Sequence, residues 1–145
     1  MTDAAVRFLA LLAAALFTGG ALYISIVEHP ARMRAGIPIA AVEFREMYRR
    51  AAPWQAGSAA VALLAGVAAA WLGAERAWAL GGIAVGVVIP YTLFVMMPVN
   101  KRLLDPAPLA EREARVLLTQ WGRLHWIRSG LGTVGLALLL WTAAR

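Results

Sequence analysis

Residues 51–98 read AAPWQAGSAAVALLAGVAAAWLGAERAWALGGIAVGVVIPYTLFVMMP, and this stretch contains two apolar runs, 51–73 and 77–98. At 1.5 Å per residue, each run forms a helix of roughly 33 Å, long enough to cross a ~30 Å hydrocarbon core. Only residues 74–76 separate the runs, and so short a connection forces an antiparallel helical hairpin. The stretch therefore predicts two helices that span a membrane.

Two further apolar runs, 6–27 and 124–144, flank this hairpin. The first run exceeds the about 7–15 apolar residues of a signal peptide, and few basic residues precede it, so we expect it to stay in the membrane. The apolar runs are too long for strands and lack alternation of apolar and polar residues. We therefore expect a single all-α domain over residues 1–145, an antiparallel four-helix bundle embedded in a membrane.

The second spanning run contains Pro53 near its start. Proline is tolerated in the first turn of a helix, where its missing N–H would have no partner. We therefore expect this helix to begin near Ala52, although Tyr48 and Gln55 would share a face if one helix ran through Pro53. The expected spans are residues 6–27, 52–73, 77–98 and 124–144.

The composition supports a membrane protein. The chain is 61% hydrophobic and 15% charged, with a mean hydropathy of +0.68, whereas soluble domains carry about 25% charged residues. It contains no cysteine, which excludes disulfides and thiolate metal sites. The net charge of +6 arises mostly between the apolar runs, so we expect the lipid bilayer rather than nucleic acid as the partner of these residues.

The two longer connections, residues 28–50 and 99–123, are charged and also carry apolar residues at helical spacing. We expect a short interfacial helix in each. Most basic residues lie in these connections: Arg32, Arg34, Arg45, Arg49, Arg50, Lys101, Arg102, Arg112, Arg115 and Arg123. The positive-inside rule then places both connections in the cytoplasm and both termini outside it, in a bacterial inner membrane.

Small residues spaced four apart occur in three of the runs. Such pairs let helix backbones approach closely. The pairs are Ala15 and Gly19, Ala62 and Gly66, and Gly82 and Gly86. We expect them to pack helices within one chain. A homo-oligomer, with such contacts between subunits, is the alternative.

The ionisable and polar side chains of the spans gather near one level. In an antiparallel bundle, the ends of the first and third helices lie beside the starts of the second and fourth. This group comprises Glu28, His29, Trp54, Gln55, Tyr91, Thr92, Asn100, Trp121, His125 and Arg128. It contains both histidines of the chain, and ionisable groups that face a bundle interior are functional candidates.

Simpler roles compete with a functional one. Trp54 and Trp121 also fit an aromatic belt at the membrane interface, and Arg128 fits an interfacial anchor. Glu28 and Arg128 would also form a structural ion pair, since charges inside membranes usually have partners. These alternatives stay open at this stage.

A metal or haem site is a further alternative. His29, His125 and Glu28 would supply two imidazoles and one carboxylate to iron, or the two histidines would bind haem axially. The spacing matches no local metal motif, and neighbouring residues on a helix point about 100° apart. Transport is disfavoured, because transporters place polar groups at the bilayer midplane and these spans are apolar there.

The segment FTGGALYISIVEHPAR at 17–32 resembles the signature of the anthrone-oxygenase-like family of small membrane proteins. Later segments agree in order: Tyr48, Ala51, Gln55, Pro90-Tyr91-Thr92, Pro98-Val99-Asn100, Trp121, Leu124-His125 and Arg128. The resemblance implies four transmembrane helices. It also implies oxidation of an anthrone-like substrate by dioxygen without a bound cofactor, as in the family's fungal members.

This resemblance suggests roles for the polar group. A neutral histidine, His29 or His125, would remove a proton from the activated methylene of an apolar phenolic substrate. Hydrogen bonds would stabilise the oxyanion, and the residues for this are Arg128, Asn100 and Tyr91. Glu28 would orient a histidine. The residues expected to contact the substrate are Trp121, Trp54, Gln55 and Tyr23. A haem or metal redox protein and a non-enzymatic membrane binder of small molecules remain the alternatives.

Overall fold

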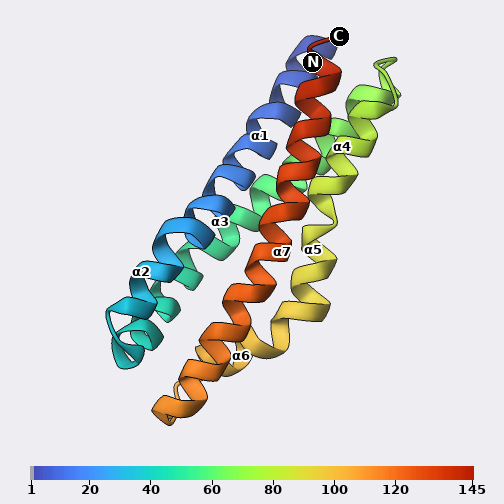
Figure 1. The fold of residues 1–145 in the computed structure, drawn as a ribbon. Helices are drawn as coiled ribbons and strands as arrows, with labels where there is room; N and C mark the ends of the chain where they lie inside the picture. The colour runs from blue at the N-terminus through green and yellow to red at the C-terminus, as the bar shows by residue number, and fades with distance from the viewer. Residues whose placement is uncertain (1) are drawn as a thin grey trace.

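The computed structural model describes residues 2–145, and over this range the regular structure is entirely helical (Figure 1). Its elements are α1 (Asp3–Tyr23), η1 (Ile24–Glu28), α2 (His29–Arg34), α3 (Ile37–Trp71), α4 (Ala77–Gly86), α5 (Val88–Tyr91), η2 (Thr92–Met96), α6 (Met97–Leu104) and α7 (Glu111–Ala143). The two η elements are π-helical. They join their neighbours into long, nearly continuous rods, which run side by side in Figure 1.

Four of the helical rods within residues 2–145 are long and apolar enough to cross a membrane. They cover Asp3–Arg34, Ile37–Trp71, Ala77–Leu104 and Glu111–Ala143. The N- and C-terminal ends of the chain lie together at one end of the bundle (Figure 1). The chain is therefore an integral membrane protein with the expected all-α, four-helix architecture.

The helices differ from the expected spans at the opposite end. Helix α3 starts at Ile37 and runs through Pro53, so the expectation of a start near Ala52 was wrong. Proline removes only one backbone hydrogen bond here, and burial of Ile37 and Phe44 stabilises the part of the helix that precedes it. Most residues expected to form separate interfacial helices likewise extend the spanning rods.

The small residues of α3 and α4 bring these two helices into close contact. A Cβ added at Gly66 would lie 2.7 Å from the Trp78 carbonyl oxygen, and one at Gly82 would lie 2.9 Å from the Ala62 carbonyl oxygen. The packing expected within one chain is therefore confirmed for this hairpin. Gly19 has nothing within 4 Å of its added Cβ, so it faces outward.

Beyond this contact the third rod changes its course. Helix α4 ends at Gly86, and Pro90 then leaves the Gly86 carbonyl without its usual helical donor. The π-helix η2 follows, and Pro98 lies just beyond it. Before Pro90 in the chain, α4 packs closely against α3. After Pro90, a cavity lies between α3 and the rest of the third rod.

Two apolar clusters fill the interior, one above and one below a polar layer. The cluster around Phe17, Trp78 and Leu139 lies toward the termini. The cluster around Phe44 and Leu118 lies toward the other end. The larger buried polar side chains between them belong to Gln55, Asn100, His125 and Arg128, with the hydroxyls of Ser25 and Ser129.

Candidate functional site

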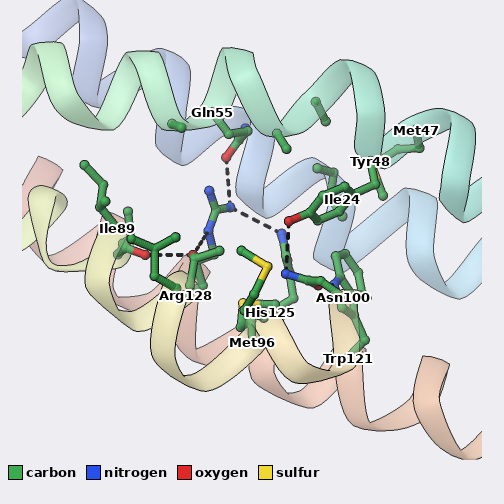
Figure 2. Close-up of a pocket in the computed structure, with 17 residues that line it drawn as sticks. Ile24, Met47, Tyr48, Gln55, Ile89, Met96, Asn100, Trp121, His125 and Arg128 are labelled. Carbon is green, nitrogen blue, oxygen red and sulfur yellow. Dashed lines mark hydrogen bonds between the residues drawn. The ribbon is translucent and has the colours of Figure 1, made fainter. Parts of the chain in front are cut away.

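A cavity of about 190 Å³ lies in this polar layer, between α3, the α5–α6 rod and α7 (Figure 2). Most of its wall is aliphatic, with Ile24, Ile89 and Met96 among the residues that line it. Its polar lining consists of Tyr48, Gln55, Thr92, Asn100, His125 and Arg128. An apolar pocket with a few convergent polar groups is the usual form of a small-molecule site.

Arg128 is the charged group of this wall, and its side chain is held by neutral partners. Its Nε donates to the Thr92 hydroxyl at 3.2 Å, and its Nη1 donates to the Gln55 amide oxygen at 3.0 Å. The guanidinium carbon also lies 4.7 Å from the centre of the Phe17 ring. Arg128 is only 8% exposed, and arginine stays charged in proteins.

No carboxylate of residues 2–145 lies within ion-pair distance of Arg128. The structural pair between Glu28 and Arg128, considered from the sequence, is therefore not formed. A buried charge without a counter-ion is costly to maintain. The cavity beside Arg128 is consequently suited to a ligand that carries an anionic or strongly polarised oxygen.

His125 lies next to Arg128 and has a defined tautomer. Its Nε2 lies 3.5 Å from Nη1 of Arg128, and its Nδ1 lies 2.9 Å from the Ser25 hydroxyl. Because a guanidinium can only donate, the ring nitrogen that faces it must be the unprotonated one. Nδ1 therefore carries the proton and donates to Ser25, and a basic lone pair is presented beside Arg128.

Two hydroxyls continue from His125 toward the first rod. The Ser25 oxygen lies 2.9 Å from the Ser129 oxygen, and Ser129 donates to the Ala21 carbonyl at 3.1 Å. This chain of donors fixes the imidazole in place, as the group that orients a catalytic histidine usually does. The π-helix η1 contributes Ser25, and π-helical turns often occur at functional sites.

Trp121 separates the two histidines. Its ring stacks on His125 with centroids 4.6 Å apart, and it meets His29 at 5.3 Å. His29 does not line the cavity, and its Nε2 would lie 2.5 Å from a Cβ added at Gly122. The sequence grouped both histidines at one level and offered either as the base, but only His125 lies in the cavity. In an antiparallel pair, the turn after Ser25 meets the turn before His125, which brings His29 to Gly122.

Glu28 also differs from its expected role. It forms an ion pair with Arg32, whose Nε lies 2.8 Å from Glu43 Oε2. The guanidinium of Arg32 packs over Trp121 at 5.8 Å, on the far side from the cavity. Glu28 therefore orients Arg32 rather than a histidine.

The alternative metal set does not assemble. Within residues 2–145, no three histidine, cysteine, aspartate or glutamate side chains are grouped closely enough to hold a metal ion. His125 lines the cavity whereas His29 does not, and the Trp121 ring contacts both imidazoles. These positions do not fit axial ligation of one haem.

Asn100 and Gln55 lie in the cavity wall, but three other expected residues do not. The Tyr91 hydroxyl donates to the Leu124 carbonyl at 3.1 Å and lies outside the lining. Trp54 is 59% exposed and lines a separate groove between α1 and α3. Tyr23 is 57% exposed. Trp54 and Tyr91 are sequence neighbours of lining residues, and the rotation of about 100° per residue turns them away.

Sequence reasoning missed Ser129 and did not place Tyr48 in the site. Ser129 lies one turn after His125 on the same helix face, so helical spacing alone would have identified it as a candidate. Tyr48 lies two turns before Gln55, and both line the cavity because α3 is continuous. The expected helix start near Ala52 put Tyr48 outside the helix that contains Gln55, so the two residues were not expected to line the same site.

The family model described as anthrone oxygenase matches residues 44–138. The chain belongs to the anthrone oxygenase family. The comparisons with curated proteins and with solved structures gave no match. The matched range contains His125, Arg128 and the rest of the polar cavity lining. The anthrone oxygenase match begins after α1 and η1, and η1 supplies Ser25 and Ile24.

Proposed function

We propose that the protein is a membrane oxygenase that uses dioxygen to oxidise the activated methylene of an apolar, phenolic, anthrone-like molecule. The observation that carries this proposal is the buried Arg128 charge, which lies beside His125 in an apolar cavity and lacks a carboxylate partner. Family membership supports the same chemistry. A site for an anthrone needs a base for the methylene and a cation for the oxyanion, and this pair supplies both.

The first step is a proton transfer. His125 Nε2 takes one proton from the methylene carbon, and the electron pair delocalises through the rings onto the carbonyl oxygen. The step converts a neutral imidazole and a neutral substrate into an imidazolium and an oxyanion. Arg128 stabilises this oxyanion, because a cation fixed in a water-poor cavity acts strongly on charge that develops there.

The second step consumes dioxygen. The electron-rich anion gives one electron to dioxygen, and the two radicals combine to form a C–O bond at the former methylene carbon. The resulting peroxide takes the proton from His125. Loss of the second C–H proton and cleavage of the O–O bond then give a carbonyl group and water. The substrate supplies all the electrons, so the proposal requires no bound cofactor.

The cavity also fits entry of the substrate from the bilayer. Its lining includes Ala52, Ala56 and Leu93 at its outer side, and Leu93 is 53% exposed. Small side chains on α3 keep this side open toward lipid. The basic connections near this end support a location at the cytoplasmic face of a bacterial inner membrane, with both termini outside.

Labelled oxygen tests the proposed function. The purified protein in lipid nanodiscs is given anthrone and ¹⁸O₂, with empty nanodiscs as the measure of spontaneous oxidation. The proposal predicts protein-dependent oxygen uptake, with one labelled atom in the new carbonyl of anthraquinone and one in water. Anthrone binding without uptake above the empty discs would instead identify a non-enzymatic binder.

A further inference from the structure

A second chain of hydrogen bonds reaches the cavity from the side opposite Arg128. The Trp121 indole nitrogen lies 2.9 Å from Asn100 Oδ1, and Asn100 Nδ2 lies 3.0 Å from the Tyr48 hydroxyl (Figure 2). All three residues line the cavity, and Asn100 is completely buried. The chain connects α7, α6 and α3.

The donors and acceptors of this chain have only one consistent arrangement. An indole N–H can donate but cannot accept. The Asn100 atom facing Trp121 must therefore be the amide oxygen, which leaves the NH₂ group facing Tyr48. The Tyr48 oxygen accepts from that group, so its own proton points elsewhere.

No protein acceptor within residues 2–145 receives the Tyr48 O–H. Tyr48 is half-buried, and a hydroxyl in a largely apolar setting normally finds an acceptor, because an unmade hydrogen bond is costly there. Since Tyr48 lines the cavity, an acceptor in the cavity would satisfy its proton. The wall then offers two donors, Arg128 and Tyr48, with the basic nitrogen of His125 as well.

We infer that Tyr48 is a further substrate-binding residue, which donates a hydrogen bond to a second oxygen of the ligand. Asn100 and Trp121 act as positioning residues that turn this donor toward the cavity. The ligand class is therefore a flat polycyclic molecule with oxygen acceptors on two edges, one for Arg128 and one for Tyr48. The inference rests on the proposed function for the aromatic nature of the ligand.

A pair of probes with the same three-ring skeleton tests this inference. 9,10-Anthraquinone has carbonyl oxygens on two opposite edges, whereas anthracene has none. Their affinities are measured by partition between nanodiscs that contain the full-length protein and empty nanodiscs. The ratio of the two affinities isolates the contribution of the oxygens, because changes in cavity shape affect both probes.

The wild-type protein should prefer anthraquinone. Tyr48→Phe should reduce that preference about three- to tenfold, the effect of losing one hydrogen bond, and should leave anthracene binding unchanged. Asn100→Asp should reduce it similarly although the phenol is retained, because a carboxylate accepts from both Trp121 and Tyr48 and draws the hydroxyl away. Trp121→Phe is the second positioning variant, because it frees the Asn100 oxygen to accept from Tyr48.

An unchanged affinity ratio in Tyr48→Phe would overturn the inference, as would a wild-type protein without preference for anthraquinone. The outcome is separable from that of the reaction. A preference that depends on Tyr48, in a protein without anthrone-dependent oxygen uptake, would support the binding role and refute the oxygenase. Oxygen uptake from anthrone in a protein whose preference for anthraquinone does not depend on Tyr48 would support the oxygenase and refute the binding role.

Discussion

The indole of Trp121 stacks on the imidazole of His125, with ring centroids 4.6 Å apart and planes inclined by 25°. This contact forms one wall of the cavity. His29 contacts Trp121 from outside the cavity lining. The two histidines of the chain therefore occupy different environments, and they should differ in their effect on the proposed reaction.

His125→Ala should reduce anthrone-dependent oxygen uptake by about 100- to 10,000-fold, the usual contribution of a general base. His29→Ala should reduce it by less than about tenfold, because His29 affects the site only through packing against Trp121. Initial rates of uptake in nanodiscs, corrected for spontaneous oxidation, provide the comparison. Equal losses of oxygen uptake in the two variants would contradict the assignment of His125, rather than His29, as the base.

The α3–α4 crossing should be sensitive to a single methyl group. Gly66→Ala places a Cβ 2.7 Å from the Trp78 carbonyl oxygen, so it should lower the free energy of unfolding by about 1–3 kcal/mol. Gly57→Ala is the matched control on the same helix, because nothing lies within 4 Å of its added Cβ. Unfolding in sodium dodecyl sulfate measures both variants. A Gly66 variant as stable as the Gly57 variant would disprove this close contact.

The ion cluster beneath Trp121 should stabilise the fold. Arg32→Leu leaves Glu28 and Glu43 without their common cation, and should cost about 2–3 kcal/mol of unfolding free energy. This lies at the low end for breaking a buried ion pair, because the Glu43 side chain is 40% exposed and partly screened. Arg34→Leu, at an exposed position of the same helix, is the control. Equal stability of the two variants would argue against a structural role for Arg32.

Orientation in the membrane can be tested cleanly, because the chain has no cysteine. Single cysteines are introduced by Glu75→Cys in the α3–α4 connection and by Ala107→Cys in the connection before α7, both at exposed positions. A membrane-impermeant maleimide added outside intact bacterial cells should label only the first. Labelling of the second from outside would reverse the orientation inferred from the basic residues.

Much of the fold was predictable, because membrane-spanning runs depend on hydropathy and length alone. The gathering of polar residues at one level was also predictable, since it follows from an antiparallel topology. The course of α3 through Pro53 was not predictable. It depends on tertiary burial of Ile37 and Phe44, which local propensity does not reveal.

The site was predictable in part. His125, Arg128, Gln55 and Asn100 line one cavity, as the sequence suggested by gathering these residues at one level. The separation of His29 from His125 depends on how the first rod, Asp3–Arg34, and α7 are shifted along each other. Spacing within either rod contains no information about that shift. Glu28 was assigned to the wrong partner because the competing cation, Arg32, lies one turn away on its own helix.

The most direct test of the central claim compares two arginines of α7. Arg128→Gln should reduce anthrone-dependent oxygen uptake by about 100- to 1,000-fold, the effect of removing an oxyanion donor, while Arg128→Lys should retain part of the rate. Arg123→Gln, at an exposed position five residues earlier, should leave uptake unchanged. Uptake by Arg128→Gln at the rate of Arg123→Gln would contradict the claim that the buried cation stabilises the reacting oxyanion.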